Sequence, residues 1–367
     1  MPDIQNLIDN YYHLFSNRIV VLALVIVIVT CIVGMFILLV WILINRNNLK
    51  KRLMLGEKLL VHYQTLLIDY LFSDDNAQEM DKIKKIAQSE FSRNILINQM
   101  IDLSINLSGE AKTKLRELYV CMGLHQDSIR KVHHRKWHIK IKGFKELSFM
   151  DITTVNDAIR KALESKNDIL RLEAQLALVR LEKHDPFGFL DHLVHPFTMW
   201  EQLNVHELIT FHNLIVPDFS RWLNSTNDTV VVFALNMIRV FKQTQAVDCV
   251  VETLKHPNTV IRRHAIDVCG EIQLRETLPT LKNRYKDEDY HNGLAIVQAM
   301  GKMPDKSILG FLKLVLDKEE DVQLQIEAAM AINKMGDIGT AVLEKLMLSG
   351  YKNYQIIIRH VLDKRIN

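Results

Sequence analysis

The sequence predicts an all-α protein in which a single N-terminal transmembrane helix precedes an α-solenoid, a stack of helical hairpins. The first observation is an uncharged apolar run over residues 19–44. The second is that similar helical segments recur at intervals of roughly 30 residues in the C-terminal half. The third is that only 13 Gly and 7 Pro interrupt 367 residues, while alternating strand patterns are missing.

The apolar run is long enough to cross a bilayer. About 20 apolar residues, each rising 1.5 Å, span the hydrocarbon core, so residues 19–44 cross it with length to spare. A cleaved signal peptide would have a shorter apolar core that ends in small residues, and this run has neither property. We expect residues 1–18 to form a short extracytoplasmic tail and residues 19–44 to form the transmembrane helix.

Basic residues indicate which side of the membrane the rest of the chain faces. Arg18 is the only Lys or Arg before the apolar run. Five follow it closely, namely Arg46, Lys50, Lys51, Arg52 and Lys58. The positive-inside rule therefore predicts a single-pass protein of the cell (inner) membrane, with its N-terminus outside and its C-terminal solenoid in the cytoplasm. The four cysteines have no paired or metal-ligand spacing, as is typical of a reducing compartment.

Residues 45–129 are predicted to form a membrane-proximal helical region. Its expected helices are 49–72, 76–89, 94–107 and 110–122, with polar breaks at 73–76 and 108–109. The first of these helices can continue the transmembrane helix, because no proline lies between them.

Residues 130–367 carry the repeats. Helical segments that begin with an acidic or amide residue start at intervals of 60, 30, 31 and 32 residues. Their predicted caps are Asp168, Asp228, Asn258, Asp289 and Asp321. Because the first interval corresponds to two repeats, a degenerate repeat is expected near residue 198. There, Thr198 and Glu201 have the spacing of a capping box.

Each first helix is predicted to end near a glycine or polar break and to be followed by a second amphipathic helix. The glycines are Gly270, Gly301 and Gly336, and the clearest second helix has Leu278, Leu281 and Tyr285 on one face. A hairpin of about 30 residues cannot bury its own apolar face, so neighbouring hairpins must stack. The last helix is expected over residues 353–364, with His360, Lys364 and Arg365 at its C-terminal end.

Two of these segments resemble the short HEAT-type repeat, an α-solenoid unit. The residues that carry the resemblance are Asp168, Leu170, Arg171 and Ala174 in DILRLEA, and Asn258, Val260, Arg262 and Ala265 in NTVIRRHA. The resemblance extends over residues 130–350, and it implies that the cap and the arginine form hydrogen bonds between repeats while the alanine permits close helix packing. The repeats at Asp289 and Asp321 keep the alanine, as Ala295 and Ala328, but lack the arginine.

The most strongly charged feature is the segment 130–145, which contains no acidic residue. Its cations are Arg130, Lys131, Arg135, Lys136, Lys140, Lys142 and Lys145. We interpret them as a candidate patch for anionic lipid or a partner protein, on the exposed face of the first repeat helix. Trp137, Ile141 and Phe144 recur at helical spacing and are predicted to form the buried stripe of that helix.

No residue is assigned to catalysis, to a cofactor or to a metal. The histidines are scattered, and His206-Glu207 lacks a second histidine at position 210, which a metalloprotease motif needs. Phosphate-binding loops, dinucleotide-binding loops and nucleophile elbows are missing from the sequence. The chain is therefore predicted not to be an enzyme.

These observations predict a membrane-tethered scaffold or adaptor that binds a partner protein through its repeat surface. The layout resembles that of accessory subunits of bacterial cell-envelope machinery, including membrane glycosyltransferases that make polysaccharide. The alternative is a HEAT-like nucleic-acid-binding protein, which the small net charge of +3 disfavours, so we expect no nucleic acid partner. A HEAT-type lyase or hydroxylase is a further, less favoured alternative, and the identity of the partner and the oligomeric state are left open.

Overall fold

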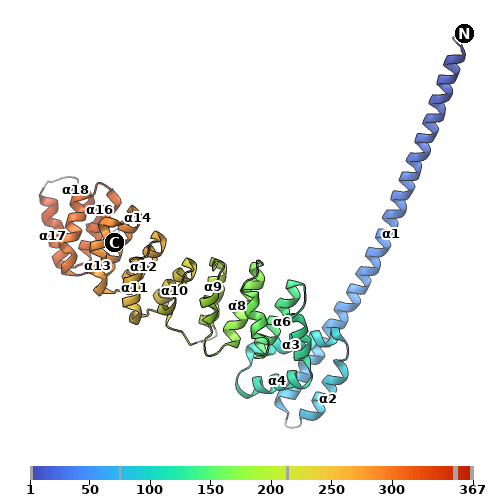
Figure 1. The fold of residues 1–367 in the computed structure, drawn as a ribbon, viewed down its shortest axis with the longest axis horizontal. Helices are drawn as coiled ribbons and strands as arrows, with labels where there is room; N and C mark the ends of the chain where they lie inside the picture. The colour runs from blue at the N-terminus through green and yellow to red at the C-terminus, as the bar shows by residue number, and fades with distance from the viewer. Residues whose placement is uncertain (1–2, 74–75, 212–214, 350–353, 364–367) are drawn as a thin grey trace. The chain divides into compact units, whose positions relative to one another are not determined.

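Figure 1 shows the computed structural model, which describes residues 3–73, 76–211, 215–349 and 354–363. These residues form helices and connecting turns without a β-strand, which confirms the all-α prediction. They divide into two compact units, Met1–Asp127 and Ser128–Asn367, referred to below as the N-terminal unit and the repeat unit.

The N-terminal unit begins with one helix of 70 residues, α1 (Asp3–Phe72). The helix runs without a break beyond the apolar segment, as the missing proline predicted. The large side chains of the apolar segment are exposed rather than packed in a core. Within the described part of the chain, α1 is the one helix that is long and apolar enough to cross a membrane.

The C-terminal end of α1 packs against short helices. These are α2 (Asn76–Ile86), α3 (Glu90–Asn106) and α4 (Gly109–Cys121). Tyr63 and Leu67 of α1 are fully buried, and the Tyr63 hydroxyl shares a hydrogen bond of 2.5 Å with the hydroxyl of Ser92 on α3. The four helices predicted for this region are confirmed, with ends that differ by a few residues.

The predicted breaks between these helices are also present. The stretch after Phe72 separates α1 from α2, although Asp74 and Asp75 lie outside the described residues. Ser108 is the N-cap of α4, and the following Gly109 adopts φ 60°, a left-handed conformation that favours glycine. The next helix, α5 (Leu124–Val132), begins in the N-terminal unit and ends in the repeat unit.

In the repeat unit, first helices alternate with second elements that are shorter in every repeat but the last (Figure 1). The first helices are α6 (Trp137–Phe149), α8 (Asp168–Leu181), α9 (Met199–Phe211), α10 (Asp228–Val240), α12 (Thr259–Glu271), α14 (Tyr290–Lys302) and α16 (Val322–Asn333). The second elements are α7 (Asn156–Ala162), η1 (Gly188–His192), η2 (Phe219–Trp222), α11 (Val247–Thr253), α13 (Leu278–Arg284), α15 (Leu309–Lys318) and α17 (Asp337–Leu348). Short 3-10 turns, η3 (Thr244–Ala246), η4 (Arg275–Thr277), η5 (Tyr285–Asp287) and η6 (Lys306–Ile308), join some of these elements, and α18 (Tyr354–Leu362) follows α17. One continuous apolar core connects the repeats, as stacking requires.

The degenerate repeat predicted near residue 198 is present as α9. Thr198 and Glu201 form the predicted capping box, because the Thr198 N–H donates to Glu201 Oε2 at 2.7 Å and the Glu201 N–H donates to Thr198 Oγ1 at 3.3 Å. The final helix is also present, although Lys364 and Arg365 lie outside the described residues.

Two predicted caps were wrong by one residue. Asn167 and Asn227, rather than Asp168 and Asp228, are the N-caps of α8 and α10, and the Asn167 side chain accepts a hydrogen bond of 2.9 Å from the backbone N–H of Leu170. Each aspartate is the first helical residue instead, where its charge suits the positive end of the helix dipole. The caps Asn258, Asp289 and Asp321 are confirmed.

The prediction of a full second helix was wrong for the repeats of α8 and α9, in which η1 and η2 are single 3-10 turns. Pro186, Pro196 and Pro217 flank these turns, and proline both removes a backbone donor and disfavours helix in the preceding residue. Aromatic side chains pack together around these turns. The ring centroid of Phe219 lies 5.8 Å from that of Phe187 and 5.9 Å from that of Phe233.

Candidate functional site

The basic segment 130–145 forms a corner between two helices, so placing it on a single helix was wrong. The last turn of α5 leads into a turn over residues 133–136, and α6 then starts at Trp137. Gly143 brings the two helices together, because a Cβ atom there would lie only 2.7 Å from the backbone nitrogen of Val132. This close approach holds the turn at the edge of the repeat unit.

A buried carboxylate neutralises one of the predicted patch residues. Lys131 Nζ lies 2.6 Å and 2.8 Å from the two carboxylate oxygens of Glu146, which also accepts a hydrogen bond from Ser128. Lys145 is paired as well, at 2.8 Å from Glu173 of α8. Lys131 and Lys145 therefore serve the packing of α5, α6 and α8. Arg130 also has an interaction partner.

The other four cations of the patch form no ion pair with any residue that the structure describes. They are Arg135, Lys136, Lys140 and Lys142. Trp137 lies among them with 42% of its surface exposed, so the prediction that it is buried was wrong. It is the first residue of α6, ahead of the packed turns that bury Ile141 and Phe144 as predicted. These four cations and Trp137 are referred to below as the basic corner.

A second exposed surface follows the first turns of the first helices. A large apolar residue one or two positions after the capping residue is 45–66% exposed in α8, α9, α12, α14 and α16, whereas Val230 and Val231 in the first turn of α10 are buried. These residues are Ile169, Trp200, Val260, Tyr290 and Val322, and they are referred to below as the apolar edge. Each of them lies in the first turn of its helix, two positions after Asn167, Thr198 or Asn258 and one position after Asp289 or Asp321. Met199 and Leu203 add exposed apolar surface around Trp200.

Buried polar pairs connect neighbouring repeats, as the HEAT-type resemblance implies. Arg171 donates to Glu201 of the next repeat at 3.3 Å, and Arg262 donates to Glu288 at 2.8 Å. Burial alone would raise the pKa of Glu288, but hydrogen bonds from Arg262, Asn292 and Arg284 hold it below its usual value.

The repeats without the arginine are joined by different donors. The Tyr285 hydroxyl donates to Glu319 at 2.8 Å, and burial raises the pKa of that hydroxyl. The Tyr290 hydroxyl donates to Asp321 at 3.1 Å. All of these groups join repeats, so none of them is assigned a chemical role.

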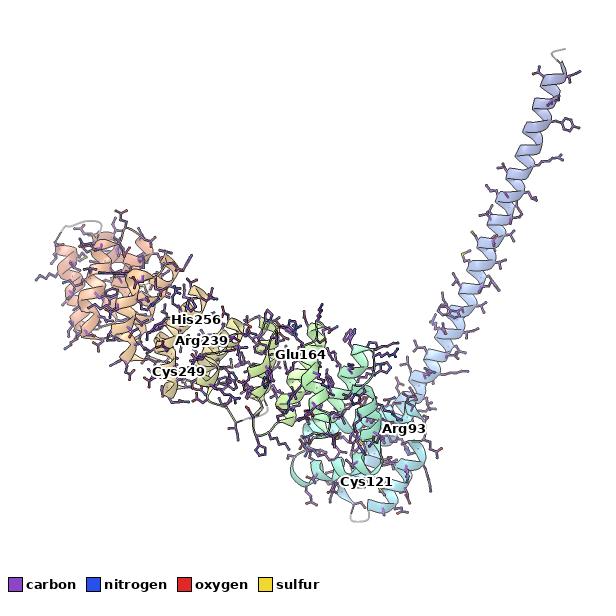
Figure 2. All side chains as sticks on the ribbon, in the orientation of Figure 1. Arg93, Cys121, Glu164, Arg239, Cys249 and His256 are labelled. Carbon is purple, nitrogen blue, oxygen red and sulfur yellow. The ribbon has the colours of Figure 1, made fainter. Side chains whose placement is uncertain are left out.

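An open cleft of about 1270 Å³ lies beside the two shortened repeats, with walls from α7, η1, η2 and the start of α10. Figure 2 labels Glu164 on one wall. The two arginines of the cleft are paired, Arg160 with Glu182 and Arg221 with Asp185 at 3.0 Å. The cleft follows from the missing second helices, and its paired charges assign it no reaction.

No group in the described residues has the surroundings of an activated nucleophile or a metal ligand set. Three His, Cys, Asp or Glu residues that could together hold a metal are not found among them. Burial raises the pKa of the Cys269 thiol to about 12, and burial lowers the pKa of His264. A thiol with so high a pKa is protonated at neutral pH and therefore a poor nucleophile.

Comparison with known proteins identifies the repeats. Residues 216–293, from just before η2 into α14, match a family described as HEAT repeats. Among solved structures, the alignment with one engineered protein covers 77% of this chain and 87% of the engineered chain, at 16% identity and a TM-score of 0.34. A second engineered protein covers 77% of this chain and 95% of its own length at 14% identity, with a TM-score of 0.21.

No curated protein matches the sequence. The match at residues 216–293 and the repeating helices agree, so the repeat unit is a helical repeat solenoid that resembles HEAT-repeat proteins over that segment, an architecture that indicates protein–protein interaction.

Proposed function

We propose that this protein is a membrane-tethered cytoplasmic scaffold, in which α1 crosses the membrane and the repeat unit binds a partner protein along the apolar edge. The observation that carries the proposal is the exposure of these apolar side chains in the first turns of five repeat helices. Stacking brings the first turns of the repeats to one side of the array, and an exposed apolar surface on a folded protein marks an interaction site. The proposal assigns no reaction to the chain.

Trp200 is the expected centre of the partner interface. Its side chain is 66% exposed, and Met199 beside it is 68% exposed. Tryptophan and methionine are enriched in protein interfaces, and tryptophan is frequent among the residues that dominate binding energy. Ile169 in the preceding repeat and Val260 two repeats further along the chain belong to the same edge.

The membrane role rests on α1. The large side chains from Val20 to Ile44 are exposed, which would be unfavourable in water, whereas a bilayer would cover them. Confinement to the inner leaflet raises the effective concentration of the repeat unit near other membrane proteins. A partner in cell-envelope polysaccharide machinery is the setting that the sequence resemblance suggests.

Crosslinking in native membranes followed by mass spectrometry tests the partner interface. The partner captured by the full chain should be lost with Trp200→Ala and kept with Leu314→Ala, a control on α15 whose side chain is 51% exposed outside the apolar edge. Equal capture by both variants would contradict the proposal. Steeply salt-dependent binding of duplex DNA by the purified chain would favour the nucleic-acid alternative instead.

Two further observations test the tether. A C-terminal alkaline phosphatase fusion should be inactive, since that enzyme needs the extracytoplasmic side, and an active fusion would reverse the topology. A soluble form of residues 53–367 that restores function in a deletion strain would show that the anchor is dispensable.

A further inference from the structure

We infer that the basic corner binds the anionic surface of the bilayer that holds α1, which gives the repeat unit a membrane contact of its own. The inference rests on the proposed membrane anchor and adds a second contact to it. It concerns Arg135, Lys136, Trp137, Lys140 and Lys142.

The charges of the basic corner are available to an external anion. None of its four cations forms an ion pair within the described residues. The carboxylates of Glu146 and Glu173, which could have reduced the positive charge, are engaged by Lys131 and Lys145. Basic residues close to an anionic leaflet are attracted to it, and the attraction weakens as salt is added.

Trp137 favours a lipid surface over other anionic partners. The indole is an apolar body with one N–H donor, which suits the boundary between headgroups and hydrocarbon, and tryptophan is enriched there. Its neighbours on the helix face, Ile141 and Phe144, are buried, so Trp137 is the one member of that stripe left to meet an external surface.

The backbone of α6 adds a smaller contribution. The cap of this helix is Lys136, which makes no side-chain capping hydrogen bond. The first helices α8, α10, α12, α14 and α16 have asparagine or aspartate oxygens at this position. The positive end of the α6 dipole therefore adds to the side-chain charges rather than being offset by a capping carboxylate.

The position of the basic corner in the chain supports a bilayer as the partner. It lies in the first helix pair of the repeat unit, which is the part nearest in sequence to the unit that carries α1. Tethering converts this contact into an intramolecular event, so a surface of only four cations can suffice. The same four cations would have to bind a nucleic acid without the gain in effective concentration that the membrane anchor provides.

The experiment uses the full chain in lipid nanodiscs with a photocrosslinker at the basic corner. We would introduce Trp137→p-benzoylphenylalanine, irradiate, and measure by intact mass spectrometry whether the adduct has the mass of a lipid. Discs of phosphatidylcholine mixed with phosphatidylglycerol should give lipid adducts. Discs of pure phosphatidylcholine should give at least about tenfold fewer, because the electrostatic attraction is lost.

Two controls separate this contact from general proximity to lipid. The same crosslinker at Tyr290, the first residue of α14 with 45% exposure, should give no lipid adduct. In the anionic discs, combining Arg135→Gln, Lys136→Gln, Lys140→Gln and Lys142→Gln should reduce the adduct at position 137 at least about tenfold. If this combined variant does not fold by circular dichroism, the comparison of anionic with neutral discs decides alone.

The outcomes distinguish the inference from the proposed anchor. A chain that resists carbonate extraction but gives no lipid adduct at position 137 in anionic discs would overturn the inference and leave the anchor standing. A chain that carbonate extracts would overturn the anchor and the inference with it. Adducts at position 137 with protein or nucleic acid instead of lipid, in native membranes, would also overturn the inference.

Discussion

Arg262 on α12 holds the carboxylate of Glu288, the residue before the cap of α14, through two parallel hydrogen bonds. Nε donates to Oε1 and Nη2 donates to Oε2, each at 2.8 Å. The side chains are 10% and 1% exposed, so the pair is shielded from water. Arg262 Nη1 also donates to the backbone oxygen of His256, labelled in Figure 2, at 2.8 Å. One arginine therefore joins a turn, a first helix and the next repeat.

Replacing Arg262 should destabilise the repeat unit strongly. Arg262→Met keeps most of the aliphatic stem but leaves the buried Glu288 without its bidentate partner, which should lower the free energy of unfolding by about 3 kcal/mol. Chemical denaturation measures the change. Arg263→Met, at the adjacent and more exposed arginine, is the control and should cost less than about 1 kcal/mol. Equal losses would show that the pair is not what joins these repeats.

The same pair predicts how stability responds to acid. The folded-state pKa of Glu288 lies below the ordinary value of 4.5, so the charged form is favoured by folding. Its contribution is present above pH 4.5 and is lost as the pH falls through the lower folded-state pKa. Glu288→Gln should therefore lose stability at neutral pH and show a shallower decline in acid than the wild type.

Thermal melting between neutral pH and pH 3 measures this difference. Glu271→Gln is the matched control, because hydrogen bonding to Lys302 lowers the pKa of Glu271 in an exposed pair that solvent screens. If the melting temperatures of both variants fall with pH as the wild-type value does, Glu288 is not the group responsible for the loss of stability in acid.

Gly270 should tolerate no side chain, although it lies inside a helix. A Cβ atom there would be 2.8 Å from the Cα of Ala299 on α14, so Gly270→Ala must push two repeats apart and should cost about 2 kcal/mol. At Gly310 in α15 nothing lies within 4 Å, so Gly310→Ala should be neutral or stabilising by about 0.5 kcal/mol. Denaturation midpoints of the two variants should move in opposite directions, and a neutral Gly270→Ala would contradict the packing described.

The cysteines should differ sharply in reactivity. Cys121 is exposed, whereas Cys269 is fully buried and burial raises the pKa of its thiol to about 12. At pH 7.5 the folded protein should therefore react with iodoacetamide at Cys121 and leave Cys269 unmodified, as peptide mass spectrometry would show. Cys249 is half-buried and should react at an intermediate rate; Figure 2 marks the positions of Cys121 and Cys249. Labelling of Cys269 at a similar rate would contradict the closed core.

Much of the repeat unit could be predicted from the spacing of its caps, and the errors have local physical causes. Asn-Asp pairs at 167–168 and 227–228 offer two adjacent acceptors, and only the backbone conformation decides which one is the cap. The prolines near η1 and η2 are compatible with two outcomes, a full second helix that ends at the proline or a helix shortened to one turn. The sequence does not distinguish these outcomes. Periodicity also assigned Trp137 to the core, because a helical pattern does not reveal where packing along that helix begins.

The candidate site, too, was predicted only in part from the sequence. The sequence identified seven cations in segment 130–145, but it could not show that Glu146 and Glu173 neutralise Lys131 and Lys145. It also missed the apolar edge, since an aliphatic residue after a cap looks like the start of a core stripe. Val260 is 57% exposed whereas the adjacent Ile261 is fully buried, and the sequence pattern does not distinguish these two aliphatic neighbours.

The sequence by itself determined the all-helical class, the apolar N-terminal helix and the repeat period. These follow from composition and from patterns along the chain, which local propensity and periodicity express directly. Only the tertiary structure decided which charges are neutralised, which apolar side chains remain exposed and where the second helices are lost. Those properties depend on contacts between residues that are far apart in the sequence, such as Lys131 with Glu146 and Lys145 with Glu173, and a linear pattern does not specify which side chains meet.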